Sequence, residues 1–177
     1  MAKKSFKNLL KKLHTPKWLF ILLLAVVILR IPFFFEPYSY GDEMIYLTLG
    51  EAIRQGIPLY SGIHDNKPPL LYLAAAVAGS LFWFKAILAI WHIITVFLFW
   101  KLTKTLFPNK DKLGKIATVI FALLTTIPLL EGNIVNAELF LIGPIIGAFI
   151  LLWPPGKKQN PKSIFYAGLL FSVATLF

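Results

Sequence analysis

The chain has no cysteine among its 177 residues. Disulfide bonds, thiol catalysis and cysteine-ligated metal sites are therefore excluded. Acidic residues are scarce as well: Asp and Glu number 8, against 18 Lys and Arg, and 15% of the residues are charged. Because a soluble domain usually has about a quarter charged residues, this composition argues against an ordinary soluble domain.

Apolar residues take the place of the missing charge and make up 58% of the chain. Several apolar runs approach the roughly 20 residues that a helix needs to cross a bilayer. We therefore predict an all-α polytopic membrane protein. The expected spans cover residues 18–35, 85–104, 115–131, 138–153 and 164–177, of which the last is incomplete.

Most of the Lys and Arg residues gather beside these runs, in residues 1–17, 101–115 and 157–162. Cytoplasmic loops carry such an excess, so we predict a basic cytoplasmic arm over 1–17. The chain is then a multi-pass protein of the cell membrane with a cytoplasmic N-terminus. Because the basic residues flank apolar runs and form no single face, we expect no nucleic-acid partner.

One apolar run does not fit a simple count of crossings. Three runs separate the first basic cluster from the second, yet two cytoplasmic clusters must be separated by an even number of crossings. The segment 68–84 opens with Pro68-Pro69 and is rich in small residues. We expect it to be an outer juxtamembrane or re-entrant helix, accompanied by a second outer helix over 41–55.

With this topology, seven of the eight acids fall on the extracytoplasmic side, which suggests a site there. Asp42 and Glu43 have a structural interpretation, because acids favour the first turn of a helix and Ser39 with Asp42 resembles a capping box. Alternatively, a carboxylate at the membrane surface takes a proton from an incoming hydroxyl or amine. Tyr46 lies four residues after Asp42, on the same helical face, where it could orient that carboxylate.

Two further residues have both a structural and a functional interpretation. Lys67, before Pro68-Pro69, is either an interfacial lysine or a cation for a lipid phosphate. Glu138 is either a first-turn acid in a helix capped by Asn136 or a second carboxylate that meets Asp42 on the outer face.

No cofactor is certain from the sequence. His64 and Asp65 lie side by side, but one histidine and one acid do not make a metal site. Alternatively, the carboxylates of Asp42 and Glu138 on the outer side could form a weak site for a divalent cation.

Three ordered motifs follow the first apolar run: Gly41-Asp42-Glu43-x-x-Tyr46, Gly56-x-x-Leu59-Tyr60 and Lys67-Pro68-Pro69-Leu70. Together they resemble the start of membrane glycosyltransferases of the GT-C superfamily, in particular protein O-mannosyltransferases and lipid A aminoarabinose transferases. The resemblance covers about residues 18–153. It implies a GT-C-type transmembrane helical bundle with juxtamembrane helices in an outer loop, and an N-terminal part of a longer enzyme that is inactive alone.

The resemblance also implies an activity. Such enzymes move a sugar from a polyprenyl-phosphate donor to a protein, lipid or cell-envelope glycan on the extracytoplasmic side, so the expected partners are this donor and membrane lipid. Asp42 is then the general base with Glu43 beside it, and Lys67 holds the donor phosphate. Glu138 stands where relatives often have Asp. The other expected substrate-binding residues are Tyr46, Tyr60 and His64.

Two other classes of membrane protein remain as alternatives to the glycosyltransferase. A transporter or lipid flippase would line a path with polar residues in the middle of its spans, whereas residues 116–130 and 139–153 contain no charge. A non-catalytic membrane assembly subunit is the other alternative. The sequence does not predict the oligomeric state.

Overall fold

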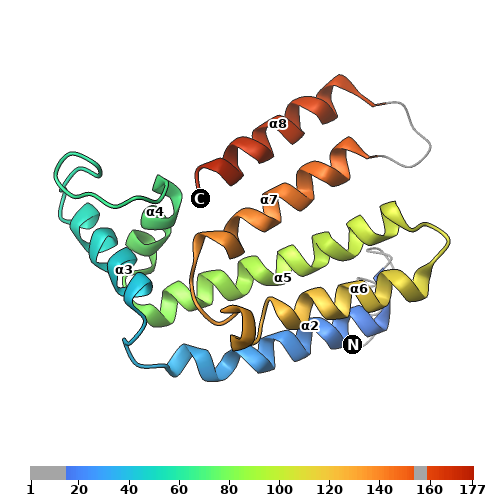
Figure 1. The fold of residues 1–177 in the computed structure, drawn as a ribbon, viewed down its shortest axis with the longest axis horizontal. Coiled ribbons are helices and arrows are strands. Elements are labelled where there is room, and N and C mark those ends of the chain that lie inside the picture. Colours follow the sequence, from blue (N-terminus) through green and yellow to red (C-terminus); the bar gives the residue numbers. More distant parts are fainter. Residues whose placement is uncertain (1–14, 154–158) are drawn as a thin grey trace, which may run out of the picture.

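The computed structural model describes residues 15–153 and 159–177, and within these ranges the chain is all-helical, with no strand (Figure 1). The α-helices are α2 (Lys17–Arg30), α3 (Gly41–Arg54), α4 (Pro69–Ala78), α5 (Leu81–Leu106), α6 (Asp111–Leu124), α7 (Ala137–Leu152) and α8 (Pro161–Thr175). Two 3-10 helices, η1 (Ile31–Phe35) and η2 (Pro128–Leu130), follow α2 and α6. The all-α prediction is confirmed. Most of the arm predicted over 1–17 lies outside the described residues.

Two helical stretches are long and apolar enough to cross a membrane, Lys17–Phe35 and Leu81–Leu106. The first stretch leaves large apolar side chains exposed, among them Ile21, Leu24 and Ile28. Contiguous exposed apolar surface of this kind is typical of a membrane or protein contact. These stretches are consistent with membrane association. The helices α6, α7 and α8 have 14, 16 and 15 residues, fewer than the roughly 20 that span a bilayer without help.

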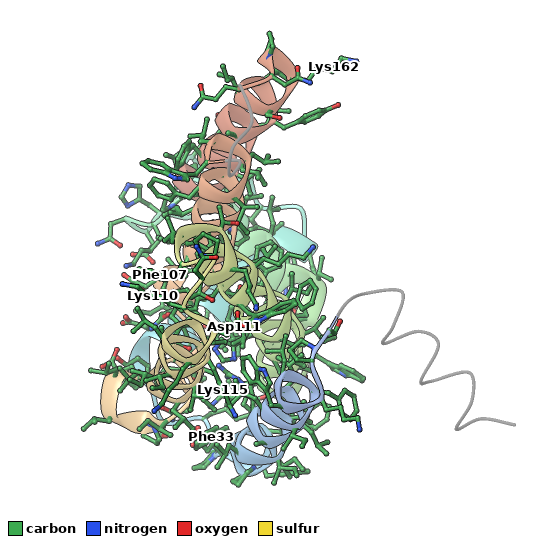
Figure 2. All side chains as sticks on the ribbon, turned by 90° about the vertical axis from the view of Figure 1, so that its right-hand side faces the viewer. Phe33, Phe107, Lys110, Asp111, Lys115 and Lys162 are labelled. Atoms are coloured by element: carbon green, nitrogen blue, oxygen red, sulfur yellow. The ribbon has the colours of Figure 1, made fainter. Side chains whose placement is uncertain are left out.

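The helix α5 is the centre of the packing. It contacts α2, α4, α6, α7 and η1, while α8 packs on α7 (Figure 1). Leu19, Val26, Val96 and Ala122 form one buried apolar cluster where α2, α5 and α6 meet. A second, larger cluster joins α3 and α4 to α5 and α7. Consequently α3 and α4 are fixed at one end of α5, and the α5–α6 connection lies at the other (Figure 1). Figure 2 looks onto this second end and labels Lys110 and Asp111 there.

The boundary between α4 and α5 differs from the sequence prediction of an outer helix over 68–84. Gly79 has a φ of 70° and ends α4 at Ala78, in the left-handed conformation that glycine adopts easily. Ser80 then caps α5, because its side chain accepts a hydrogen bond from the backbone N–H of Trp83. The span predicted over 85–104 therefore begins at Leu81.

The capping predictions had mixed outcomes. Asn136 caps α7, with Glu138 in the first turn, as expected. The prediction of a capping box at Ser39 is wrong. The N-cap of α3 is the next residue, Tyr40, whose side chain makes no capping hydrogen bond. The hydroxyl of Ser39 donates to the carbonyl of Pro37 instead, at 3.4 Å.

The contact between α3 and α4 depends on Gly50. A Cβ at this position would lie 2.6 Å from the backbone nitrogen of Ala76 and 2.7 Å from the carbonyl carbon of Ala75. Because these are backbone atoms, they cannot move aside without separating the two helices. Gly168 offers a matched control, since a Cβ there meets nothing within 4 Å.

We expect Gly50→Ala to lower the free energy of unfolding by about 1–3 kcal/mol, the usual cost of overpacking. Gly168→Ala should leave it nearly unchanged. Thermal unfolding of the detergent-solubilised protein, followed by tryptophan fluorescence, measures both. Equal midpoints for the two variants would show that α3 and α4 do not pack closely at Gly50.

Candidate functional site

Three segments that are far apart in the sequence meet at one end of α5. They are the start of α3 with Asp42, the loop before α4 with Lys67, and the start of α7 with Glu138. The Nζ atom of Lys67 lies 3.4 Å from Oε1 of Glu138. The two side chains are 31% and 61% exposed, so this ion pair is accessible from solvent. Asp42 is exposed as well.

The backbone of Lys67 is held on both sides by tyrosines. Its N–H donates to the hydroxyl of Tyr72 at 3.0 Å, and its carbonyl accepts from the hydroxyl of Tyr60 at 2.8 Å. The hydroxyl of Tyr72 in turn donates to Oδ2 of Asp65 at 2.8 Å. Pro68 and Pro69 follow with fixed φ angles. The side chain of Lys67 therefore extends from a backbone segment that is held rigidly.

Tyr60 also carries the backbone strain of this region. Its φ is 72°, a conformation that residues other than glycine rarely adopt. Strained residues of this kind cluster at functional sites, where the surrounding structure holds them in place. Here the strained turn directs the Tyr60 hydroxyl towards the carbonyl of Lys67.

Tyr46 connects Asp42 to this group. It is buried, and its ring meets that of Tyr72 edge-on, with 5.9 Å between centroids. Burial raises the pKa of Tyr46 well above its usual value, and the carboxylates of Asp42, Glu138 and Asp65 raise it further. Three carboxylates thus act on one hydroxyl. We call Asp42, Tyr46, Asp65, Lys67, Tyr72 and Glu138 the Lys67 cluster.

Glu43 does not belong to this cluster, because its carboxylate lies on the buried side of α3 and is 2% exposed. Its Oε1 accepts a hydrogen bond from the backbone N–H of Val135 at 2.7 Å, and its Oε2 lies 3.6 Å from Nζ of Lys85. Burial raises the pKa of Glu43, whereas the Val135 N–H and the Lys85 ammonium act in the opposite direction.

Lys85 is the cation of this buried group and is 3% exposed. It forms a second ion pair with Glu36, whose Oε1 accepts from Nδ2 of Asn133 at 3.3 Å. The lysine thus joins the start of α5 to the segment before α3. We call Glu36, Glu43, Lys85 and Asn133 the Lys85 network.

His64 lies at the edge of the region. It is exposed, and its ring meets that of Tyr60 edge-on, with 6.5 Å between centroids. Within residues 15–153 and 159–177, no group of three or more His, Asp or Glu side chains could hold a metal ion. A cation held by Asp42 and Glu138 stays a prediction.

A second buried polar network lies farther along the bundle and joins α2, α5 and the end of α6. Arg30 donates from Nε to Nδ1 of His92 at 3.4 Å and from Nη2 to the carbonyl of Thr125 at 3.0 Å. Because Nδ1 accepts, Nε2 of His92 carries the proton and donates to Oγ1 of Thr125 at 2.7 Å. Arg30 and His92 are therefore structural partners of each other.

The sequence interpretation missed Lys85 and Tyr72. Lys85 had a signal, since a lone ionisable residue in an apolar run requires a partner, but its acids lie 49 and 42 positions earlier in the chain. Tyr72 had none: it occupies an ordinary position in a short apolar helix, and only the fold places it against Lys67.

Comparisons of the chain with protein-family models, with curated proteins and with solved structures found no match.

We expect Lys85→Met to destabilise the protein by about 3–5 kcal/mol, the cost of removing one partner of a buried ion pair. The reason is that Glu43 would keep its buried charge without a cation. The double variant Glu43→Gln/Lys85→Met should recover part of this loss. Thermal unfolding in detergent measures all three proteins, and a Lys85→Met protein as stable as the wild type would contradict the prediction.

Proposed function

We propose that the chain is the N-terminal part of a membrane glycosyltransferase. The enzyme moves a sugar from a polyprenyl-phosphate donor to a hydroxyl or amine acceptor on the extracytoplasmic side. The observation that carries this proposal is the convergence of Asp42, Lys67 and Glu138, which come from three separate segments. These are the positions that the resemblance to GT-C enzymes assigns to the general base, the donor phosphate and a second acid.

The geometry supports a role for Lys67 in binding the donor. Its ammonium is partly exposed and pairs with the carboxylate of Glu138. An exposed ion pair of this kind contributes about 0–1 kcal/mol, so an incoming phosphate can replace the carboxylate at little cost. In the reaction, Lys67 neutralises the phosphate as the bond between the sugar and the phosphate oxygen breaks.

We assign Asp42 the role of the general base that acts on the acceptor. Its carboxylate takes the proton from the acceptor hydroxyl or amine while the acceptor atom forms the new bond to the anomeric carbon. The attack comes from the side opposite the leaving phosphate, so the configuration at that carbon inverts. The hydroxyl of Tyr46, one helical turn after Asp42, is close enough to that carboxylate for the charge to raise its pKa, and we assign Tyr46 the role of orienting Asp42. Glu43, paired inside the protein, fixes the rotation of α3.

The transporter alternative draws on one observation, the burial of Arg30, Lys85 and His92 within the two membrane-length helices. Intramembrane charges can line a transport path. Here each of the three makes a hydrogen bond or ion pair with another group of the protein, which favours a structural role. The transferase is therefore the better-supported function.

We expect Asp42→Asn to lower sugar transfer by roughly 100-fold or more, the size of a general-base contribution. The assay follows release of radiolabelled sugar from a polyprenyl-phosphate donor by membranes that hold the full-length protein. Glu51→Gln is the matched control, because Glu51 is an exposed acid of the same helix paired with Arg54. It should keep wild-type turnover.

Two results would contradict these assignments. If the donor is turned over and Asp42→Asn equals the wild type, Asp42 is only a first-turn acid. If no donor of a broad panel is turned over, the transferase proposal is wrong, and transport of the same lipids by reconstituted protein becomes the next measurement.

We also expect Lys67→Gln to lower transfer by about 10²–10³-fold, as for the loss of one group that stabilises a developing negative charge. Lys67→Arg should retain part of the activity, since it keeps the charge but not the compact geometry. Steady-state kinetics with varied donor concentration measure both variants. Unchanged donor kinetics in Lys67→Gln would remove Lys67 from the site.

A further inference from the structure

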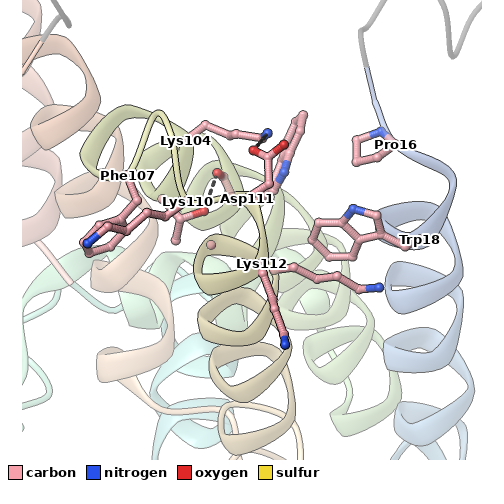
Figure 3. Close-up of a pocket in the computed structure, with 11 residues that line it drawn as sticks. Pro16, Trp18, Lys104, Phe107, Lys110, Asp111 and Lys112 are labelled. Atoms are coloured by element: carbon pink, nitrogen blue, oxygen red, sulfur yellow. Dashed lines mark hydrogen bonds and ion pairs between the residues drawn. The ribbon is translucent and has the colours of Figure 1, made fainter.

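A pocket of about 340 Å³ lies at the end of the bundle opposite to the Lys67 cluster (Figure 3). It opens between the start of α2, the last turns of α5 and the start of α6. Trp18 forms its wall on the α2 side, and Phe107 lies at the end of α5. Neither the proposed transfer reaction nor its residues involve this pocket.

The pocket is strongly basic. Its lining includes four lysines and one acid: Lys104, Lys110, Lys112, Lys115 and Asp111. Asp111 forms an ion pair with Lys104, which leaves an excess of positive charge in the pocket. The ammonium of Lys115 stands over the ring of Trp18, 5.6 Å from its centroid. Figure 2 shows Lys110, Asp111 and Lys115 together, with Lys162 far away at the start of α8.

Hydrogen-bond donors accompany this charge. Trp100 lines the pocket and is 6% exposed, and no described residue accepts a hydrogen bond from its buried Nε1. A buried donor without a partner is costly, so it points to a missing acceptor. The start of α6 also faces this region, and its N-cap, Lys110, provides no side-chain cap. The first N–H groups of a helix, together with its dipole, attract anions.

We propose that this pocket binds a phosphate group, carried by the headgroup of an anionic membrane lipid or present as free phosphate. The lysine ammonium groups suit phosphate as compact charges, and Trp100 Nε1 supplies a directed hydrogen bond. Its position favours the lipid source, since the pocket lies at the ends of the two stretches long enough to cross a membrane. Basic pockets at the cytoplasmic ends of transmembrane helices bind anionic headgroups in this way.

The test compares lipid retention by the detergent-solubilised chain in native mass spectrometry. The probes are phosphatidylglycerol and phosphatidylcholine with the same acyl chains, and inorganic phosphate as a competitor. The pocket variant is Lys112→Gln/Lys115→Gln. Its control is Lys101→Gln/Lys162→Gln, which removes the same charge from lysines that do not line this pocket.

We expect the wild type to retain phosphatidylglycerol over phosphatidylcholine. The pocket variant should lose about tenfold or more in affinity, since each of its two lysines near a membrane surface contributes roughly fivefold. The control should keep the wild-type affinity. Trp100→Phe, which keeps an aromatic ring but removes the donor, should weaken binding without changing the unfolding temperature by more than a few degrees.

The competitor identifies the source of the phosphate. Displacement of the lipid by millimolar inorganic phosphate supports a site for the free ion, and retention against it supports a lipid site. Equal retention of the two lipids by the wild type would overturn the proposal. An equal loss in the pocket variant and the control would also overturn it, because binding would then follow net charge alone.

Discussion

The burial of the Lys85 ammonium is the constraint on which the rest of the structure depends. A charge in an apolar helix must find partners, and Lys85 finds Glu36 and Glu43 on segments that precede it by more than forty residues. Glu43 also accepts a hydrogen bond from Val135, so one network fixes α3 and the segment that leads into α7. Neighbouring residues of a helix point in different directions, and a buried Glu43 therefore keeps Asp42 at the surface. The same contact with Val135 places Glu138, three residues later, beside Lys67.

The arrangement of polar groups along the bundle follows from the same physics. The Lys67 cluster lies at one end of α5, and the basic pocket with Lys112 and Lys115 lies at the other. Between them, Arg30, His92 and Thr125 are joined by hydrogen bonds. The buried Arg30, His92 and Lys85 are thus paired within the apolar helices, whereas Lys67 and the pocket lysines at the two ends remain partly open. Paired charges within the bundle and accessible charges at both of its ends suit a protein in a membrane. Both proposed ligands, the polyprenyl-phosphate donor and the anionic headgroup, would bind at these ends through a phosphate group.

Parts of this arrangement could be read from the sequence and parts could not. The motifs around Asp42 and Lys67, and the acid Glu138 in the next outer loop, led to residues that the fold brings together. The sequence also contains a signal for the end of α4, because Gly79 and Ser80 form a helix stop followed by a cap. The prediction of one helix over 68–84 missed this signal, since the apolar residues continue on both sides of it. Lys85 was visible as a lone charge, whereas its partners were not, since no local pattern relates positions 36, 43 and 85. Nothing in the sequence indicated the role of Tyr72, because that role depends on the fold placing its hydroxyl against Asp65 and the backbone of Lys67.

The sequence by itself determined the helical class, the apolar runs, the absence of cysteine chemistry and the separation of basic clusters from acids. These properties follow from composition and from local periodicity, which each segment carries alone. The tertiary structure decided that Glu43 is buried and Asp42 exposed, that Lys85 pairs with Glu36 and Glu43, and that Tyr46 and Tyr72 belong to the Lys67 cluster. Burial and pairing depend on how each helix is rotated against its neighbours, and that rotation is set by contacts between residues far apart in the chain.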